Sequence, residues 1–261
     1  MSVEDRGYQT VRVGVEGPIC TITLSVPERK NPIGPQMVNE LLYALDDAKD
    51  DQSVRVVVLT GAGDAFSAGG DLKQMSSGGS SLELKGDYAD LLLRFSKLGK
   101  PTIARVNGVA MGGGLGLVAG CDFAIAKASA IFGTPEIKRG LFPMMIMAVL
   151  ARVVSRRRLL EMMLLGEKMS AEQAEAIELV TRAVPDDRLD AEVGALAAKL
   201  AAQSPTAMRM GLAAYHHQAD RALVEAVPYL RDQLIAILGT ADASEGLMAF
   251  MEKREPRWTG R

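Results

Sequence analysis

The sequence predicts an α/β fold with a mostly parallel sheet, followed by a helical C-terminal region. Two apolar, β-branched runs, residues 54–60 and 101–106, each lead into a glycine-rich turn and then into a segment able to start a helix. Repeated units of this kind need crossover connections, which favour parallel strands. From Met144 onward the strand pattern nearly disappears. A length of 261 residues is sufficient for a single sizeable core.

The N-terminal part alternates between strands and helices. Residues 11–15 and 19–24 flank Glu16-Gly17-Pro18, which predicts a strand, a turn and a strand. Pro35 begins a helical pattern of apolar residues. The continuous apolar run 54–59 is typical of a buried parallel strand.

The alternation continues after the first glycine-rich turn. The low-complexity segment 76–81 predicts a surface loop that leads into an amphipathic helix around residues 91–98. A strand, a turn and a helix are expected over residues 102–118, and residues 122–126 predict a further strand.

The C-terminal part is predicted to be helical. Ser170 and Gln173 form a capping box, and Ser204-Pro205 is typical of a helix start. We therefore divide the chain into an α/β core, residues 1–195, and a helical region, residues 196–261. The Ala-, Leu- and Met-rich helices of this region either pack on the chain's own core or cover a neighbouring subunit.

Composition and charge exclude several classes of protein. The net charge of −2 provides no basic field for nucleic acid. Cys20 and Cys121 are too few for a disulfide framework and lack metal-ligand spacing. No run of about 18 apolar residues suggests a membrane span. The polar segment 1–10 has the pattern of neither a signal nor a transit peptide, so we expect a cytoplasmic protein.

The two glycine-rich turns, residues 65–73 and 106–114, indicate carbonyl chemistry. Glycines at a strand-to-helix junction leave backbone N–H groups uncovered, and a helix N-terminus attracts negative charge. One N–H group from each turn could hold a single developing oxyanion, which is usually the largest electrostatic contribution in such reactions.

Glu136 is the candidate acid–base group. It follows Pro135, which favours the first turn of a helix, and its neighbours Phe132 and Ile137 are apolar. Partial burial would raise the pKa of this carboxyl toward a value useful for proton transfer. The alternative is a helix-start glutamate that interacts with the helix dipole.

Taken together, these segments resemble the crotonase superfamily, the enoyl-CoA hydratase/isomerase family. The resemblance covers nearly the whole chain and is carried by six segments: Arg29-Lys30-Asn31-Pro32, Ala68-Gly69-Gly70-Asp71-Leu72-Lys73, Asn107 to Gly114, Cys121 to Ala126, Phe132 to Ile137, and Phe250 to Arg254. It implies the crotonase (ClpP-like) fold of repeated ββα units with a helical C-terminal trimerisation region. It further implies a homotrimer or a dimer of trimers.

The resemblance also assigns roles to individual residues. The N–H groups of Gly70 and Gly113 would hold the thioester oxygen, and Glu136 would transfer a proton. The residues expected to contact coenzyme A or substrate are Arg29, Lys30, Ala68, Gly69, Gly70, Asp71, Leu72, Gly113, Phe250 and Lys253, the last two often from a neighbouring subunit. No metal, flavin or nicotinamide is implied, because coenzyme A arrives as part of the thioester substrate.

Gly116 departs from the family pattern, in which hydratases usually carry a first glutamate two residues after the third glycine. With Glu136 alone, a shift of the double bond is the simpler reaction, although hydration remains possible if a backbone group or the substrate positions the water. Gly116 is expected to leave room for water or for a substrate carboxylate. Met144 to Met147 could shorten the acyl pocket and favour short or branched chains.

Rival functions fit the sequence less well. Residues 114–119 match a dinucleotide-binding pattern, but Lys127 and Ala128 stand where the ribose-binding acid is needed. Ser67 lacks the surroundings of a hydrolase nucleophile. His216 and His217 point to different helix faces and make a poor metal site. We therefore expect an enoyl-CoA hydratase, because that activity is the commoner one for such a match, with an isomerase or a non-catalytic CoA-binding protein as alternatives.

Overall fold

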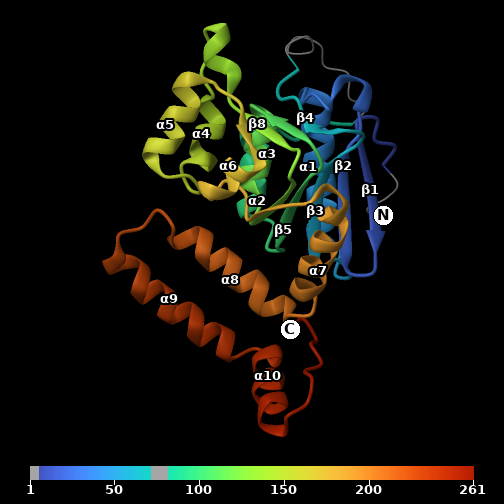
Figure 1. Ribbon diagram of the computed structural model, residues 1–261. Coiled ribbons are helices and arrows are strands. Elements are labelled where there is room, and N and C mark those ends of the chain that lie inside the picture. Colours follow the sequence, from blue (N-terminus) through green and yellow to red (C-terminus); the bar gives the residue numbers. More distant parts are fainter. Residues whose placement is uncertain (1–5, 72–81) are drawn as a thin grey trace.

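The computed structural model describes residues 6–71 and 82–261, and its largest element is a twisted, mostly parallel sheet (Figure 1). The sheet has the order β1-β2-β3-β5-β7-β10. Its strands are β1 (Val11–Glu16), β2 (Ile19–Leu24), β3 (Val56–Gly61), β5 (Thr102–Val106), β7 (Phe123–Lys127) and β10 (Arg182–Val184). The first pair is antiparallel and every other pair is parallel, as the alternating pattern predicts.

A second, smaller sheet has the order β4-β6-β8-β9. Its strands are β4 (Ala65–Ser67), β6 (Val109–Met111), β8 (Ile131–Gly133) and β9 (Met169–Ser170). The pairs β3/β4, β5/β6 and β7/β8 each contribute one strand to each sheet, in the same order. The repeated ββ units are therefore present. The sequence pattern did not reveal the short strands, because two or three residues are too few to show a period of two.

The helices cover both faces of the larger sheet and form the C-terminal part. The α-helices are α1 (Pro35–Asp50), α2 (Tyr88–Ser96), α3 (Gly113–Gly120), α4 (Met144–Leu150), α5 (Arg156–Leu165), α6 (Ala171–Ala176), α7 (Leu189–Ala201), α8 (Pro205–Gln218), α9 (Leu223–Leu238) and α10 (Ala241–Glu252). Short 3₁₀ helices are η1 (Pro27–Arg29), η2 (Pro135–Arg139) and η3 (Asp186–Arg188).

The predicted helix starts agree with the structure. Helix α1 begins at Pro35, Ser170 and Gln173 form the capping box of α6, and Ser204 caps α8 with proline at its first position. Helix α2 begins at Tyr88, three residues before the predicted range, because Asp87 caps it. The predicted loop at residues 76–81 lies outside the described residues.

The central strands of the larger sheet, β3, β5 and β7, bury both of their faces. Val57 and Leu59 of β3 pack into the main core with α1, whereas Val56 and Val58 face a second cluster with α7. This alternation follows from the period of two in a strand. The predicted boundary between residues 195 and 196 falls inside α7, which packs on the sheet as far as Ala201.

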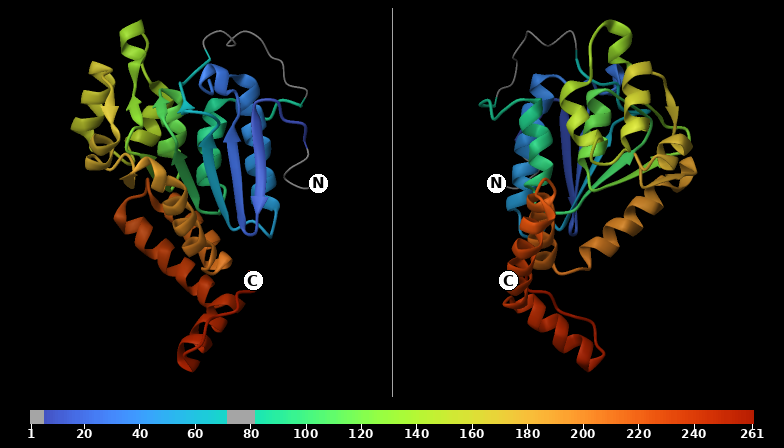
Figure 2. Two further views of the ribbon diagram at one scale, coloured as in Figure 1. Left: turned by 45° about the vertical axis from the view of Figure 1, so that its right-hand side comes forward. Right: turned by 90° about the vertical axis from the view of Figure 1, so that its left-hand side faces the viewer.

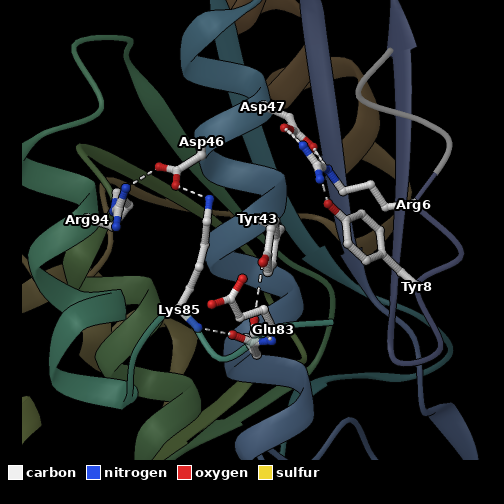
Figure 3. A network of polar contacts seen from close by, with 9 residues as sticks. Arg6, Tyr8, Tyr43, Asp46, Asp47, Glu83, Lys85 and Arg94 are labelled. Atoms are coloured by element: carbon white, nitrogen blue, oxygen red, sulfur yellow. Dashed lines mark hydrogen bonds and ion pairs between the residues drawn. The ribbon is translucent and has the colours of Figure 1, made fainter. Parts of the chain in front are cut away.

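Polar contacts from α1 hold the segment that leads into α2 (Figure 3). Asp46 forms ion pairs with Lys85 and with Arg94 of α2. The side chain of Asn39 donates to the carbonyl oxygen of Glu83 at 3.0 Å and accepts from the N–H of Lys85 at 2.7 Å. The start of α2 is thereby fixed against α1, close to the turn that begins α3.

Helices α8, α9 and α10 extend away from the α/β core (Figures 1 and 2). Many of their large apolar side chains are exposed, among them Leu223, Ile235 and Phe250. Within the described residues, no single helix is long and apolar enough to cross a membrane. Among the described helices, α9 and α10 are long and apolar enough when taken together, by length and composition alone, but the pair is bent by 72°.

Candidate active site

A cavity of about 790 Å³ lies where the two glycine-rich turns meet. One wall comes from these turns, a second from α2 and the segment before it, and a third from η2 and the start of α4. The predicted site residues Ala68, Gly69, Gly70, Asp71, Gly113 and Glu136 all line it. The structure therefore brings together side chains and backbone groups that are far apart in the sequence.

The first turn follows β4 and is held by the segment after η1. The N–H of Ile33 donates to the oxygen of Gly69 at 2.8 Å, and the N–H of Asp71 donates to the oxygen of Ile33 at 2.9 Å. Neither bond uses the N–H of Gly70. Gly69 has φ +97°, and a Cβ there would lie 2.9 Å from the oxygen of Met111. This close approach of the two turns requires glycine at position 69.

The second turn begins α3. Gly112 has φ +49° and ψ −121°, and its N–H donates to the oxygen of Gly133 at 3.0 Å. Gly113 is the first residue of α3, where N–H groups have no acceptor within the helix. The positive end of the helix dipole therefore meets the cavity at Gly113. This geometry is suited to holding a negatively charged oxygen.

The carboxylate of Glu136 lies against the second turn. A Cβ on Gly112 would lie 2.6 Å from Oε1 of Glu136. Oε2 is buried and has no hydrogen-bond partner among the described residues. Burial raises the pKa of Glu136, although its own backbone N–H and the guanidinium of Arg139 lower it in part. A raised pKa is expected of an acid–base group and not of a helix-start glutamate that interacts with the helix dipole.

The expectation that Gly116 leaves open space is wrong. A Cβ on Gly116 would lie 2.3 Å from Cγ2 of Ile146 and 2.5 Å from the hydroxyl oxygen of Tyr88. The room that a larger side chain would need is therefore taken by a tyrosine from α2 and an isoleucine from α4. Neither a substrate carboxylate nor a glutamate side chain fits at this point without displacing them.

The remaining predicted contact residues lie at different distances from the cavity. The guanidinium of Arg29 binds both carboxylate oxygens of Asp71, at 2.7 and 2.8 Å, and Asp71 is buried. Lys30 is exposed beside this ion pair. Phe250 and Lys253 stand at the end of α10, away from the cavity of their own chain. Leu72 lies outside the described residues.

Tyr88 is the site residue that sequence reasoning missed. It belongs to no glycine-rich segment and is 25 residues from Gly113, whose carbonyl oxygen it contacts. A signal was nevertheless available, since Asp87-Tyr88 begins an amphipathic helix with Asp90 as its capping partner. The pattern alone does not tell which way the first side chain of that helix points.

Comparison with known proteins places the chain in a family. A family model described as enoyl-CoA hydratase/isomerase matches residues 14–261. The chain belongs to the enoyl-CoA hydratase/isomerase family. The predicted family, the mixed α/β fold with a parallel sheet and the expectation of an enzyme are all confirmed.

Individual members of the enoyl-CoA hydratase/isomerase family align with almost the whole chain. A probable enoyl-CoA hydratase of Mycobacterium bovis is 35% identical over 255 residues, covering 97% of this chain and 99% of that protein. A putative enoyl-CoA hydratase of Thermus thermophilus is 35% identical and covers 93% and 98%. The crystal structure of an enoyl-CoA hydratase from Mycobacterium smegmatis superimposes with a TM-score of 0.89 at 35% identity, covering 96% and 99%.

Proposed function

We propose that this protein is an enoyl-CoA hydratase that adds water reversibly to a 2-enoyl-CoA thioester. The observation that carries the proposal is the contact between the Glu136 carboxylate and Gly112, at the point where both glycine-rich turns face one cavity. An acid–base group and two backbone donors are the minimum that such a reaction needs. The similarity to proteins named enoyl-CoA hydratase supports the same conclusion.

The reaction follows from the chemistry of these groups. The N–H groups of Gly70 and Gly113 hold the thioester oxygen, so that negative charge can develop there as a bond forms at the β-carbon. The carboxylate of Glu136 takes a proton from the attacking water. The resulting enolate then receives a proton at its α-carbon from the same carboxyl group, which returns to its ionised form. One water molecule is added and Glu136 ends unchanged.

The acyl group is proposed to be short or branched and uncharged. Leu141, Phe142, Met144, Met145 and Ile146 line the cavity on the side of α4. Among the described lining residues, Arg139 is the one cation, and it is exposed at the rim. An apolar wall favours an apolar acyl chain. Since the space at Gly116 is filled, a carboxylate on the substrate would have no place there.

Double-bond isomerisation is the second candidate function. Gly116 supplies no carboxylate, and one base that removes a proton and returns it elsewhere is sufficient for that reaction. A third possibility, binding of coenzyme A without turnover, is opposed by the retention of Glu136 and both turns.

We also propose that the protein assembles as a homotrimer or a dimer of trimers. The exposed apolar side chains of α9 and α10 support this, since soluble monomers seldom expose so many together. In such an assembly, Phe250 and Lys253 would be available to the coenzyme A of a neighbouring subunit. Sedimentation of the purified protein tests the assembly.

Mass spectrometry tests the proposed function. The purified protein is incubated with short, branched and carboxylated 2-enoyl-CoA thioesters and with 3-enoyl isomers. A product heavier by one water establishes a hydratase. A change in chromatographic position at constant mass, with uptake of deuterium from heavy water, establishes an isomerase instead. If no substrate reacts while CoA thioesters still bind, the protein is a non-catalytic member.

A further inference from the structure

Tyr88 lines the same cavity as Glu136. Its hydroxyl lies 3.5 Å from the position of a Cβ on Gly113, whereas Glu136 lies against the preceding residue, Gly112. Glu136 comes from η2 and Tyr88 from the first position of α2, next to α3 (Figure 1). Two oxygen-bearing side chains thus converge over two consecutive glycines.

The hydroxyl proton of Tyr88 already takes part in a hydrogen bond. The hydroxyl group donates to the carbonyl oxygen of Gly113 at 2.5 Å. A phenol has one proton to donate, while its oxygen can also accept hydrogen bonds. Burial and the neighbouring Glu136 carboxylate raise the pKa of Tyr88, so that it stays protonated at neutral pH. Towards the cavity, Tyr88 is therefore a neutral acceptor and cannot serve as a base.

Water that attacks a β-carbon has a defined requirement for acceptors. Its lone pair must face the carbon, so both of its hydrogens are available for donation. One goes to the base that will take it, and the second needs another acceptor if the molecule is to be held in one orientation. The carboxylate of Glu136, which lines this cavity, suits the first hydrogen.

We propose that the hydroxyl oxygen of Tyr88 is the second acceptor, which orients the attacking water for Glu136. This inference rests on the proposed hydratase function. It explains how hydration can proceed although Gly116 contributes no carboxylate. The tyrosine fills the space above Gly116 and provides an acceptor without adding a second negative charge, which would oppose formation of the enolate.

Two other roles for Tyr88 make different predictions. A ring that only fills space would work equally well without its hydroxyl. If the hydroxyl acts through the Gly113 carbonyl, its removal would disturb the first turn of α3 and so weaken the binding of the thioester oxygen. If the hydroxyl orients the water, its removal would slow the addition of water but leave the binding and polarisation of the thioester unchanged.

The test is a kinetic and spectroscopic study of Tyr88→Phe, which keeps the ring that packs over Gly116. Tyr8→Phe is the matched control, because Tyr8 also loses a hydrogen-bonded hydroxyl, 3.4 Å from Asp47, at a site outside the cavity lining. Hydration of a short 2-enoyl-CoA gives kcat and KM. The carbonyl stretch of the bound, ¹³C-labelled thioester is recorded in Glu136→Gln and in Glu136→Gln/Tyr88→Phe, where turnover does not interfere.

The expected result for Tyr88→Phe is a fall of about tenfold in kcat, the effect of one neutral hydrogen bond. KM and the thermal midpoint should stay close to those of the parent, and the carbonyl stretch of the double variant should stay close to that of Glu136→Gln. Tyr8→Phe should match the parent in kcat, KM and thermal midpoint. An unchanged kcat overturns the inference in favour of space filling. A carbonyl stretch that returns toward its solution value overturns it in favour of the Gly113 route. If the parent protein adds no water at all, the proposed function itself fails.

Discussion

Glu136 and Gly112 are in direct contact, with Oε1 of the carboxylate 2.6 Å from the position that a Cβ atom on Gly112 would occupy. The contact places Glu136 of η2, the proposed acid–base group, over the residue that precedes Gly113, the proposed oxyanion donor. Any side chain at position 112 would push the carboxylate away, and φ +49° independently favours glycine there. The spacing between base and donor therefore depends on the second glycine-rich turn.

Replacement of Glu136 by glutamine should abolish most turnover without loss of binding. The amide has nearly the same shape but can neither accept nor return the proton, and a positioned acid–base group typically contributes about 10²–10⁴ in rate. Steady-state kinetics and calorimetric titration with a CoA thioester measure the two effects separately. Glu172→Gln, an exposed change in α6, is the control. A Glu136→Gln protein as active as its parent would show that another group carries the proton.

The pH dependence of hydration should report the raised pKa of Glu136. The carboxylate must be ionised to accept a proton, so the rate should fall as the pH drops through this pKa, at a higher pH than for an ordinary glutamate. Arg139 lowers the pKa of Glu136, hence Arg139→Gln should move the acid limb of kcat/KM further up in pH. Lys138→Gln, on the same 3₁₀ helix, should leave it in place. A limb that shifts equally in both variants would contradict a specific effect of Arg139.

Substitution of alanine for Gly116 should destabilise the protein, although alanine is normally the better helix former. The added methyl group would collide with Ile146 and with the Tyr88 hydroxyl, and overpacking of this kind costs about 1–3 kcal/mol. Gly194→Ala is the matched control in α7, because nothing lies within 4 Å of its Cβ position. It should stabilise by roughly 0.5–1 kcal/mol. Equal effects of the two changes on the free energy of unfolding would show that α3 and its neighbours accommodate the added methyl group without strain.

Asp242 should stabilise the C-terminal helices in a pH-dependent way. Burial opposes its ionisation, yet hydrogen bonds from Ser204, Thr259 and Gly260 together lower the pKa of Asp242 to about 2. The native pKa is below the unfolded value of 3.8, so the stabilisation is complete above about pH 4 and is lost as the pH falls toward 2.

Asp242→Asn should therefore lower the thermal midpoint at neutral pH, and its difference from the parent should shrink as the pH falls from 4 toward 2. Asp187→Asn, an exposed change in η3, serves as the control. A difference that stays constant down to pH 2 would mean that the charge of Asp242 does not contribute. Differential scanning calorimetry across this range decides between the two.

Elements with a strong local signal could be predicted from the sequence. Strand β3 of the larger sheet is β-branched and continuously buried, and the helix starts at Pro35, Ser170 and Ser204 carry their caps within a few residues. The glycine-rich turns were likewise recognisable, because each is a short contiguous motif, whereas Glu136 was assigned its role through the family resemblance. Local chemistry of this kind does not depend on the rest of the fold.

The tertiary structure alone decided what surrounds these motifs. Whether Gly116 borders an empty space depends on where α2 and α4 pack, and that arrangement buries it under Tyr88 and Ile146. The contact between Glu136 and Gly112 likewise joins residues from separate units of the two sheets. Sequence determines which groups are available locally, whereas the close packing of whole elements sets the distances between remote groups. At Gly116, where the chain itself has no side chain, Tyr88 and Ile146 from other elements fill the space.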